Sequence, residues 1–284
     1  MSQPTLVFGI GAAKSGTGWL QTYLRDHKDC FFRNLKELHY FDSLDSGMGS
    51  FYRDDATSRV QRESKKLANH RDAKNNTWLP LLISDLNEWM DVFDGQTAVD
   101  GRYLKYIGHD RTDVALVGDF TPAYAGCSKP MLKHMSRMAE NVRFVYIMRD
   151  PVDRLWSHIR MDAGKGGVEA IVEQYLSDSR PNIANESDYC GRIGGLLEVV
   201  PKKQLHIEFF ERLFSKEAIE KLCRFLSISV KPACYSKAVH KGNAKALDPL
   251  LRMVFQRKLK RQYDFVEDLF GGLPREWTNK MVTL

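Results

Sequence analysis

The chain has 284 residues, 43% of them hydrophobic and 27% charged, which is the composition of an ordinary folded protein. These proportions exclude a disordered chain, a collagen-like chain and a small disulfide scaffold. The 42 basic and 36 acidic residues give a net charge of +6, and the whole excess lies in the last 54 residues. A local excess of this kind predicts an anionic partner, which is a phosphorylated small molecule, a nucleic acid or a membrane surface.

The cysteines and the apolar segments indicate in which cellular compartment the protein is expected. The chain has five cysteines, an odd number, scattered and without a CxxC pair, so we expect reduced thiols and neither disulfides nor a zinc site. No apolar run approaches the length of a membrane span, and the first residues do not resemble a secretory leader. We therefore expect a cytoplasmic protein.

Four short runs of β-branched and apolar residues each have the length of a buried strand. Apolar residues at helical spacing follow the first and the fourth run. Because strands alternate with helices, we predict an α/β fold with a central, mostly parallel sheet and helices on both faces. No repeat or Pro/Ser-rich linker divides the chain, so residues 1–284 are expected to form one domain. The four predicted strands are 5–10, 114–120, 142–148 and 205–210.

Residues 43–113 interrupt this alternation and are expected to be a helical insertion. The stretch 53–74 holds seven basic and four acidic residues, whereas 78–93 has the spacing of an amphipathic helix. Charged runs usually face water, which favours a solvated insertion. The alternative is a lid or wall of a substrate site, because insertions on rigid α/β scaffolds commonly carry specificity.

The first strand runs into the sequence GAAKSGTG and then into a helix. Glycines let the backbone direct several N–H groups at one anion, and the helix N-terminus adds partial positive charge, so a phosphate-binding loop is predicted. It is not a Walker A loop, GxxxxGK[ST], because Lys14 precedes Gly16 and no Lys-Ser or Lys-Thr pair follows that glycine. Ordinary nucleoside triphosphate hydrolysis is therefore disfavoured.

Two segments resemble sulfotransferases. Residues 13–20, AKSGTGWL, are similar to the 5′-phosphosulfate loop of that family, usually written PKSGTTWL. Residues 144–158, FVYIMRDPVDRLWSH, resemble the strand, loop and helix that hold the 3′-phosphate of 3′-phosphoadenosine 5′-phosphosulfate (PAPS). An arginine presents a fork of donors to a phosphate, and a nearby hydroxyl adds another, which are roles that Arg149 and Ser157 match.

The resemblance implies a P-loop-like sulfotransferase fold and PAPS as the co-substrate, with no metal. A third segment, HKGNAK at 240–245, is similar to the basic Lys-Gly-Arg loop that closes over the nucleotide, although Asn243 replaces the arginine. The residues expected to bind the nucleotide are Lys14, Ser15, Gly16, Thr17, Gly18, Trp19, Arg149, Ser157, Lys241, Gly242 and Asn243.

The prediction of the acceptor side depends on the sequence KELHYFD at 36–42. This segment resembles the KExHFFD segment of heparan-sulfate and related carbohydrate sulfotransferases. The resemblance implies that Glu37 is the catalytic base and that His39 and Asp42 belong to its hydrogen-bond network. Such a base is needed because an alcohol is a poor nucleophile at neutral pH; with Lys14, these residues are the predicted catalytic set.

A further segment, GDFTPAY at 118–124, resembles a GDxTPAY segment of the same enzymes. Phe120 stands where some members carry a functional lysine, which argues against assuming a glycosaminoglycan acceptor. Asp119 either orients the acceptor or caps a turn at the end of a strand, and the sequence does not choose between these roles.

The motifs together predict transfer of the PAPS sulfuryl group to a hydroxyl of a carbohydrate or small metabolite, releasing 3′,5′-adenosine bisphosphate. One alternative is a kinase-like enzyme that uses ATP. Another is a non-catalytic module that binds nucleic acid through its basic C-terminal region. We expect neither a nucleic-acid partner nor a membrane span, and the sequence does not specify the acceptor or the oligomeric state. The basic residues concerned are Arg252, Arg257, Lys258, Lys260 and Arg261.

Overall fold

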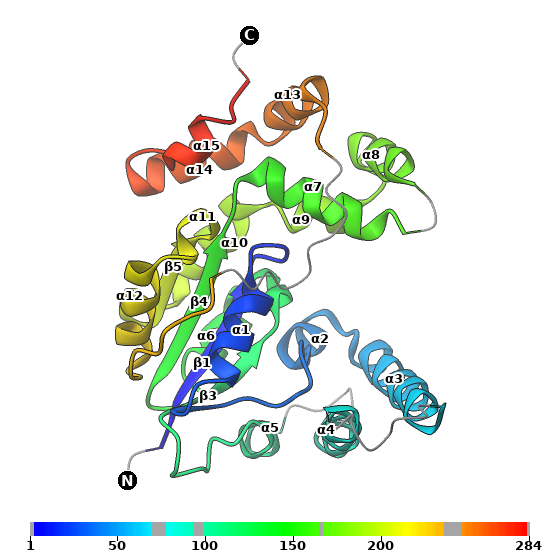
Figure 1. The fold of residues 1–284 in the computed structure, drawn as a ribbon, viewed down its shortest axis with the longest axis vertical. Helices are drawn as coiled ribbons and strands as arrows, with labels where there is room; N and C mark the ends of the chain where they lie inside the picture. Colours follow the sequence, from blue (N-terminus) through cyan, green and yellow to red (C-terminus); the bar gives the residue numbers. More distant parts are fainter. Residues whose placement is uncertain (1–2, 70–77, 94–98, 165–166, 236–245, 283–284) are drawn as a thin grey trace.

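A five-stranded parallel sheet forms the centre of the computed structural model, which describes residues 3–69, 78–93, 99–164, 167–235 and 246–282 (Figure 1). The strand order is β2-β3-β1-β4-β5, and every neighbouring pair is parallel. The predicted α/β fold with a parallel central sheet is therefore confirmed. The strands are β1 (Thr5–Gly11), β2 (Cys30–Phe31), β3 (Leu116–Phe120), β4 (Val142–Met148) and β5 (Leu205–Phe209).

Helices cover both faces of the sheet because alternate side chains of each buried strand point to opposite sides. On β1, Val7 packs with α1 (Thr17–Arg25) and α12 (Lys216–Leu226), whereas Leu6 and Phe8 belong to the larger core on the other face. That second face is covered by α6 (Lys129–Met135), α10 (Tyr189–Val199) and the 3₁₀ helix η2 (Pro122–Gly126).

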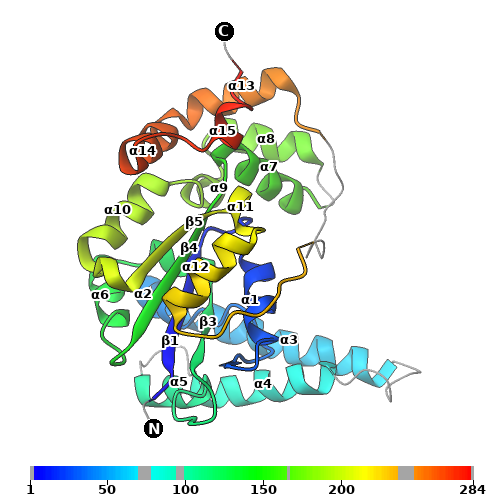
Figure 2. The same cartoon turned by 60° about the vertical axis from the view of Figure 1, so that its left-hand side comes forward.

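The chain between β2 and β3 is largely helical. Its elements are α2 (Tyr40–Ser46), α3 (Gly49–Asn69), α4 (Trp78–Val92) and α5 (Asp100–Tyr106). The predicted amphipathic helix is thus confirmed as α4. Figure 2 shows α3 and α4 lying side by side, with α4 near the amino-terminal ends of the strands.

The helices after β4 and the C-terminal helices gather at the other end of the sheet (Figure 1). Asp150 caps α7 by accepting from the Asp153 N–H at 2.9 Å, and Pro151 is its first residue. Fully buried Trp277 anchors the C-terminal segment by packing its ring edge-on against Phe209. These elements are α7 (Pro151–Asp162), α8 (Val168–Leu176), α9 (Pro181–Asn185), α11 (Phe210–Leu213), α13 (Pro249–Lys258), α14 (Lys260–Phe270) and α15 (Arg275–Thr278), whereas η3 (Lys202–Gln204) leads into the amino-terminal end of β5.

The basic residues of the C-terminal helices largely pair with acids of the same chain. Arg252 contacts Asp153 on α7 at 2.5 Å, and Lys258 contacts Asp178 at 2.7 Å. Lys260 pairs with Asp264, four residues further along α14, at 2.6 Å. Part of the local positive charge therefore serves to hold these helices to the body of the protein.

The topology brings three chain segments to one edge. Because the strands are parallel, the carboxyl ends of β1, β3 and β4 lie next to one another. The loop after β1, the residues around Asp119 and the Arg149 turn therefore meet there. Among the described helices, none has both the length and the apolar composition needed to cross a bilayer.

Candidate active site

The loop between β1 and α1 has the backbone of an anion-binding turn. Its start is fixed to the sheet by the Ala12 N–H, which donates to the Ile147 carbonyl at 2.8 Å. Gly16 has φ 85°, and a Cβ there would come within 3.0 Å of the Phe210 ring, so both conformation and space require glycine. Among the residues described, the fully buried Ser15 hydroxyl has no hydrogen-bond partner. Because such a group costs about 1–3 kcal/mol when left unsatisfied, it fits a ligand oxygen in this loop.

Arg149 joins this loop to the end of β4. Its Nη1 donates to the Lys14 carbonyl at 2.9 Å, and its guanidinium lies over the Phe210 ring, 4.6 Å from the centroid. Its Nε is buried and has no partner in the described part of the chain. The guanidinium is therefore held in place while a donor remains for an anion.

Helix α7 brings Ser157 to the same place. The Lys14 Nζ lies 3.3 Å from the Sδ of Met161. Because residues four apart share a helix face, Ser157 lies on the side of α7 that meets Lys14. The structure thus brings together the predicted nucleotide residues Lys14, Ser15, Gly16, Arg149 and Ser157.

The pKa of Lys14 is affected by the Arg149 guanidinium nearby. Burial, followed by the neighbouring Arg149 guanidinium, lowers the pKa of the Lys14 ammonium below its ordinary value. Glu37 is close enough to oppose that shift. Lys14 is therefore within electrostatic reach of both a second cation and the carboxylate of the predicted base.

Glu37, His39 and Asp42 form a connected cluster. The His39 Nδ1 and the Asp42 Oδ2 are 2.8 Å apart, and the His39 Nε2 lies 3.8 Å from the Glu37 Oε2. Burial lowers the pKa of His39, but the hydrogen bonds to Asp42 and Glu37 outweigh it and raise the pKa to about 9. His39 is therefore an imidazolium at neutral pH. The Glu37 side chain is 56% exposed, so a substrate could reach it.

The backbone at these residues is unusual. In the described residues, five non-glycine positions have left-handed φ values, and three of them are Lys14, Glu37 and His39, with φ of 68°, 55° and 53°. Non-glycine residues rarely adopt this conformation, and those that do concentrate at functional sites. The backbone observation thus points to the same residues as the side-chain geometry.

Asp119 lies beneath this cluster, fully enclosed. It accepts hydrogen bonds from Tyr124 at 2.5 Å, Thr121 at 2.9 Å and Tyr103 at 3.2 Å. Burial raises its pKa to about 6, although these hydrogen bonds oppose the shift. The Tyr124 hydroxyl also accepts from the Tyr40 N–H at 3.1 Å. Asp119 therefore supports the chain segment that carries Glu37 and His39 and does not face an acceptor.

The comparisons with known proteins give the family and the fold of the chain. A model described as "Sulfotransferase family" matches residues 4–232. The chain belongs to the sulfotransferase family. The solved structure of a sulfotransferase from Alicyclobacillus acidocaldarius is 19% identical with a TM-score of 0.60, covering 98% of this chain and 100% of that one. The sulfotransferase domain of the Synechococcus PCC 7002 olefin synthase is 17% identical with a TM-score of 0.57, covering 96% and 98%.

At these identities the two structures establish the shared fold. No curated protein sequence matches the chain. The match is to the sulfotransferase family as a whole, and the nearer resemblance to carbohydrate sulfotransferases stays a prediction.

Four family-implied residues are placed away from this centre or outside the described residues. Lys241, Gly242 and Asn243 lie outside the described residues. Trp19 is 7% exposed and packs between the rings of Tyr23 and Phe214 on the α1 and α12 face.

The first residues of α1 complete the family loop. Thr17 begins the helix, directly after Gly16. A Cβ at Gly18 would meet no atom within 4 Å, so the space around this glycine does not require it. Its contribution to a sulfotransferase loop is therefore the backbone alone.

Two residues at the site were not predicted. The Tyr52 ring, from α3, stacks on His39 with centroids 4.3 Å apart and planes 16° apart. Met161 contacts Lys14 from α7. Helical spacing from Ser157 was a usable signal for Met161, whereas the sequence holds no signal that Tyr52 meets His39.

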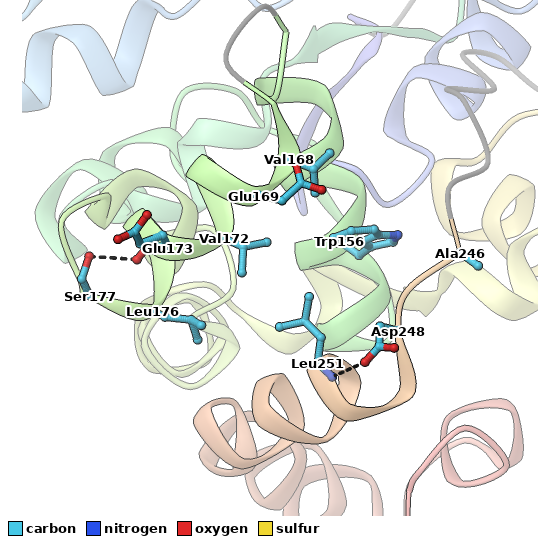
Figure 3. Close-up of a pocket in the computed structure, with 10 residues that line it drawn as sticks. All are labelled: Trp156, Val168, Glu169, Val172, Glu173, Leu176, Ser177, Ala246, Asp248 and Leu251. Atoms are coloured by element: carbon cyan, nitrogen blue, oxygen red, sulfur yellow. Dashed lines mark hydrogen bonds between the residues drawn. The ribbon is translucent and has the colours of Figure 1, made fainter.

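An apolar pocket of about 640 Å³ lies between α7, α8 and the start of α13 (Figure 3). Its walls include Trp156, Val172 and Leu251. At about 100° of rotation per helical residue, Trp156 is about 140° around α7 from Met161. The pocket is therefore on a different side of α7 from the Lys14 contact, and no predicted site residue lines it.

The charge on His39 predicts a pH dependence of stability. Its folded pKa of about 9 is above the unfolded value of about 6.5, so its stabilisation is full below pH 6.5 and lost as pH rises to about 9. We expect the wild type to lose on the order of 2 kcal/mol across this range through His39. Denaturant unfolding at several pH values should show that His39→Gln removes most of this slope.

A matched control is His134→Gln, because the His134 Nε2 is 3.0 Å from Asp100 but its side chain is 47% exposed. Solvent screens such a pair, so the slope should stay near that of the wild type. Parallel curves for His39→Gln and the wild type would contradict the assigned charge state.

Proposed function

We propose that this sulfotransferase moves the sulfuryl group of PAPS to a hydroxyl of a carbohydrate or small metabolite and releases 3′,5′-adenosine bisphosphate. One observation carries the proposal: Arg149, which is suited to a phosphate, binds the Lys14 carbonyl, and Glu37, which is suited to a proton, is within electrostatic reach of the Lys14 ammonium. Sulfuryl transfer between two oxygens needs these two functions on opposite sides of the reacting group.

The nucleotide side is proposed to hold two phosphates. The Ser15 hydroxyl and the N–H groups of Gly16 and Thr17 would bind the 5′-phosphate at the start of α1. Arg149 and Ser157 would bind the 3′-phosphate, since Arg149 contacts the Lys14 backbone and Met161, one helical turn after Ser157, contacts the Lys14 side chain. Gly18, Trp19, Lys241, Gly242 and Asn243 are assigned to the nucleotide by resemblance alone.

Lys14 is proposed to stabilise charge on the phosphate oxygen that leaves. Its ammonium is held beside the loop, and the depressed pKa shows that it already lies in a positive, partly desolvated environment. A negative charge that develops on the leaving oxygen would be stabilised by the positive charge of the Lys14 ammonium. This is preorganised electrostatic stabilisation, and it requires no metal ion.

Glu37 is proposed to take the proton from the acceptor hydroxyl. The His39 Nε2 lies 3.8 Å from the Glu37 Oε2, and Asp42 orients His39 through its 2.8 Å contact. His39 and Asp42 thus act through Glu37. The proposal treats the chain as one cytoplasmic domain with the insertion at 43–113.

The experiment that tests the proposal compares thermal shifts with 3′,5′-adenosine bisphosphate and with ATP plus magnesium. A ligand at about a hundred times its dissociation constant adds about 2.7 kcal/mol, or roughly 5 °C for a protein of this size. We expect a shift with the bisphosphate alone. A shift with ATP alone would favour the kinase-like alternative. No shift with either ligand, together with salt-sensitive RNA or DNA binding, would favour the nucleic-acid module.

Replacing Arg149 with alanine should distinguish the contribution of the 3′-phosphate to nucleotide affinity from that of the 5′-phosphate. Loss of charge-assisted hydrogen bonds worth about 1.5–3 kcal/mol predicts a bisphosphate affinity about 10- to 100-fold weaker, with 5′-AMP much less affected. Isothermal titration with both nucleotides measures this. Arg143→Ala is a matched control on β4, the strand that precedes Arg149, where Arg143 donates to the Phe225 carbonyl at 3.2 Å. Equal losses for both nucleotides would mean that Arg149 acts only by holding the Lys14 carbonyl.

A further inference from the structure

Helix α14 contacts both sides of the turn that carries Arg149, through two adjacent residues. The buried Tyr263 donates its hydroxyl hydrogen to the Asp150 Oδ2 at 3.0 Å, directly after Arg149 in the chain. The neighbouring Gln262 accepts a hydrogen bond from the Cys190 N–H at 3.0 Å through its Oε1. Asp150 caps α7 and Cys190 lies in the first turn of α10, so α14 holds the starts of two helices at once.

The Tyr263 hydrogen bond completes the surroundings of Asp150, which is 1% exposed. The Asp150 Oδ1 accepts from the Asp153 N–H at 2.9 Å, and the Oδ2 accepts from Tyr263. The Asp150 N–H donates to the Glu211 Oε1 at 3.1 Å. Because a buried oxygen without a donor is costly, loss of the Tyr263 hydroxyl should displace the residue that follows Arg149.

The contact at α10 reaches Arg149 through Tyr189. The Tyr189 hydroxyl accepts from the Arg149 N–H at 3.2 Å and donates to the Arg149 carbonyl at 2.7 Å. Besides its bond to Cys190, Gln262 donates from its Nε2 to the Oδ1 of Asp188, the cap of α10, at 3.3 Å. The backbone of Arg149 is therefore connected to α14 on both sides.

The C-terminal segment at 249–282 is attached to α7 and not to the loop proposed to hold the 5′-phosphate. Arg252 and Lys280 both bind Asp153, in the first turn of α7, at 2.5 and 2.7 Å. In the described structure, no hydrogen bond or ion pair joins this segment to the loop between β1 and α1. A change in α14 should therefore affect the 3′-phosphate and spare the 5′-phosphate.

We propose that Gln262 and Tyr263 are positioning residues for Arg149, so that the C-terminal helices set the affinity for the 3′-phosphate. This inference rests on the proposed function, in which Arg149 binds that phosphate. The guanidinium is held by the Lys14 carbonyl and the Phe210 ring, and α14 fixes the backbone from which it extends. Such a side chain must be placed to about 0.5 Å for its donors to meet a ligand.

The test is isothermal titration of Tyr263→Phe and Gln262→Met with 3′,5′-adenosine bisphosphate and with 5′-AMP. Each variant keeps the size of the side chain and removes its hydrogen bonds to the turn. The dissociation constant for the bisphosphate should rise about 3- to 10-fold, the usual effect of removing one member of a coupled network. The value for 5′-AMP should change less than about twofold. A folded variant of either kind with wild-type affinity for the bisphosphate, or with equal losses for both nucleotides, overturns the proposal.

A matched control is Tyr106→Phe. Tyr106 is 3% exposed, and its hydroxyl donates to the Asp85 carbonyl at 2.9 Å, but it lies on α5, near the opposite end of the sheet. This substitution also removes a buried tyrosine hydroxyl, and it should leave both affinities unchanged. A selective loss of bisphosphate affinity in Tyr106→Phe would mean that general stability and not position is responsible, which would also overturn the proposal.

A double variant separates positioning from general structure and from the proposed function. In Arg149→Ala there is no guanidinium to position, so adding Tyr263→Phe should not weaken bisphosphate binding further. A further loss as large as in the wild-type background overturns the inference. Equal losses for both nucleotides in Arg149→Ala alone would overturn the proposed role of Arg149. A selective loss there, with none in Tyr263→Phe, would overturn this inference and leave the proposed function in place.

Discussion

Replacing Lys14 with methionine is expected to lower kcat by about 100- to 1,000-fold. Removing one preorganised group that stabilises transition-state charge typically costs about 2.7–4 kcal/mol. Methionine keeps the unbranched stem of lysine, so its packing beside the Met161 thioether is retained and the fold should be unaffected. The loss is therefore expected in kcat, with little change in the melting temperature.

Single-turnover rates with saturating PAPS, together with bisphosphate titration and thermal unfolding, measure the effect. Lys28→Met is the matched control, because Lys28 is an exposed lysine just after α1 and outside the site. It removes the same charge without touching the loop. A kcat for Lys14→Met close to that of Lys28→Met would show that Lys14 does not act on the leaving oxygen.

Glu37→Gln is expected to reduce transfer by about 100- to 10,000-fold, the usual contribution of a general base. Glutamine has the same size and keeps the backbone at φ 55° as glutamate does, so the loop geometry should persist. What is lost is the oxygen that accepts the proton. The affinity for 3′,5′-adenosine bisphosphate should stay within about twofold of wild type, since Glu37 lies on the acceptor side.

Glu88→Gln serves as the control for this substitution. Glu88 is bound by Arg33 at 2.7 Å and lies on α4, outside the candidate site. Preserved transfer in Glu37→Gln would move the base to His39 or Asp119. The structure disfavours both, because His39 is already protonated at neutral pH and the Asp119 oxygens are occupied by three hydroxyl groups.

The local sequence was sufficient to predict most strands of the sheet. The strand at 142–148 has the bounds that were predicted, and the helix after the first strand is present as α1. β2 was not predicted, because a two-residue strand is too short to show a period. β3 begins at Leu116 and not at 114.

Some residues of the candidate site were likewise predictable from the local sequence, and others were not. Residues that belong to one contiguous motif, such as Lys14 or Glu37, were predictable because their neighbours carry the pattern. Tyr52 was not, because its position depends on the turn at Gly47 that folds α3 back onto α2. The charged stretch of α3 is largely exposed, as a solvated insertion would be, yet its first turn reaches His39. The insertion is therefore exposed along most of α3 and contacts a predicted site residue through Tyr52.

The left-handed backbone at Lys14, Glu37 and His39 has a consequence for protein engineering. Glycine or asparagine adopts this conformation more easily, so either residue at Lys14 or Glu37 should stabilise the fold by up to about 1 kcal/mol, whereas at His39 it would also remove the contacts to Asp42 and Glu37. A library selected only for heat resistance is therefore expected to enrich such replacements and to lose turnover with each of them. Thermostable variants that keep their activity will have to gain stability elsewhere, with these three positions held constant.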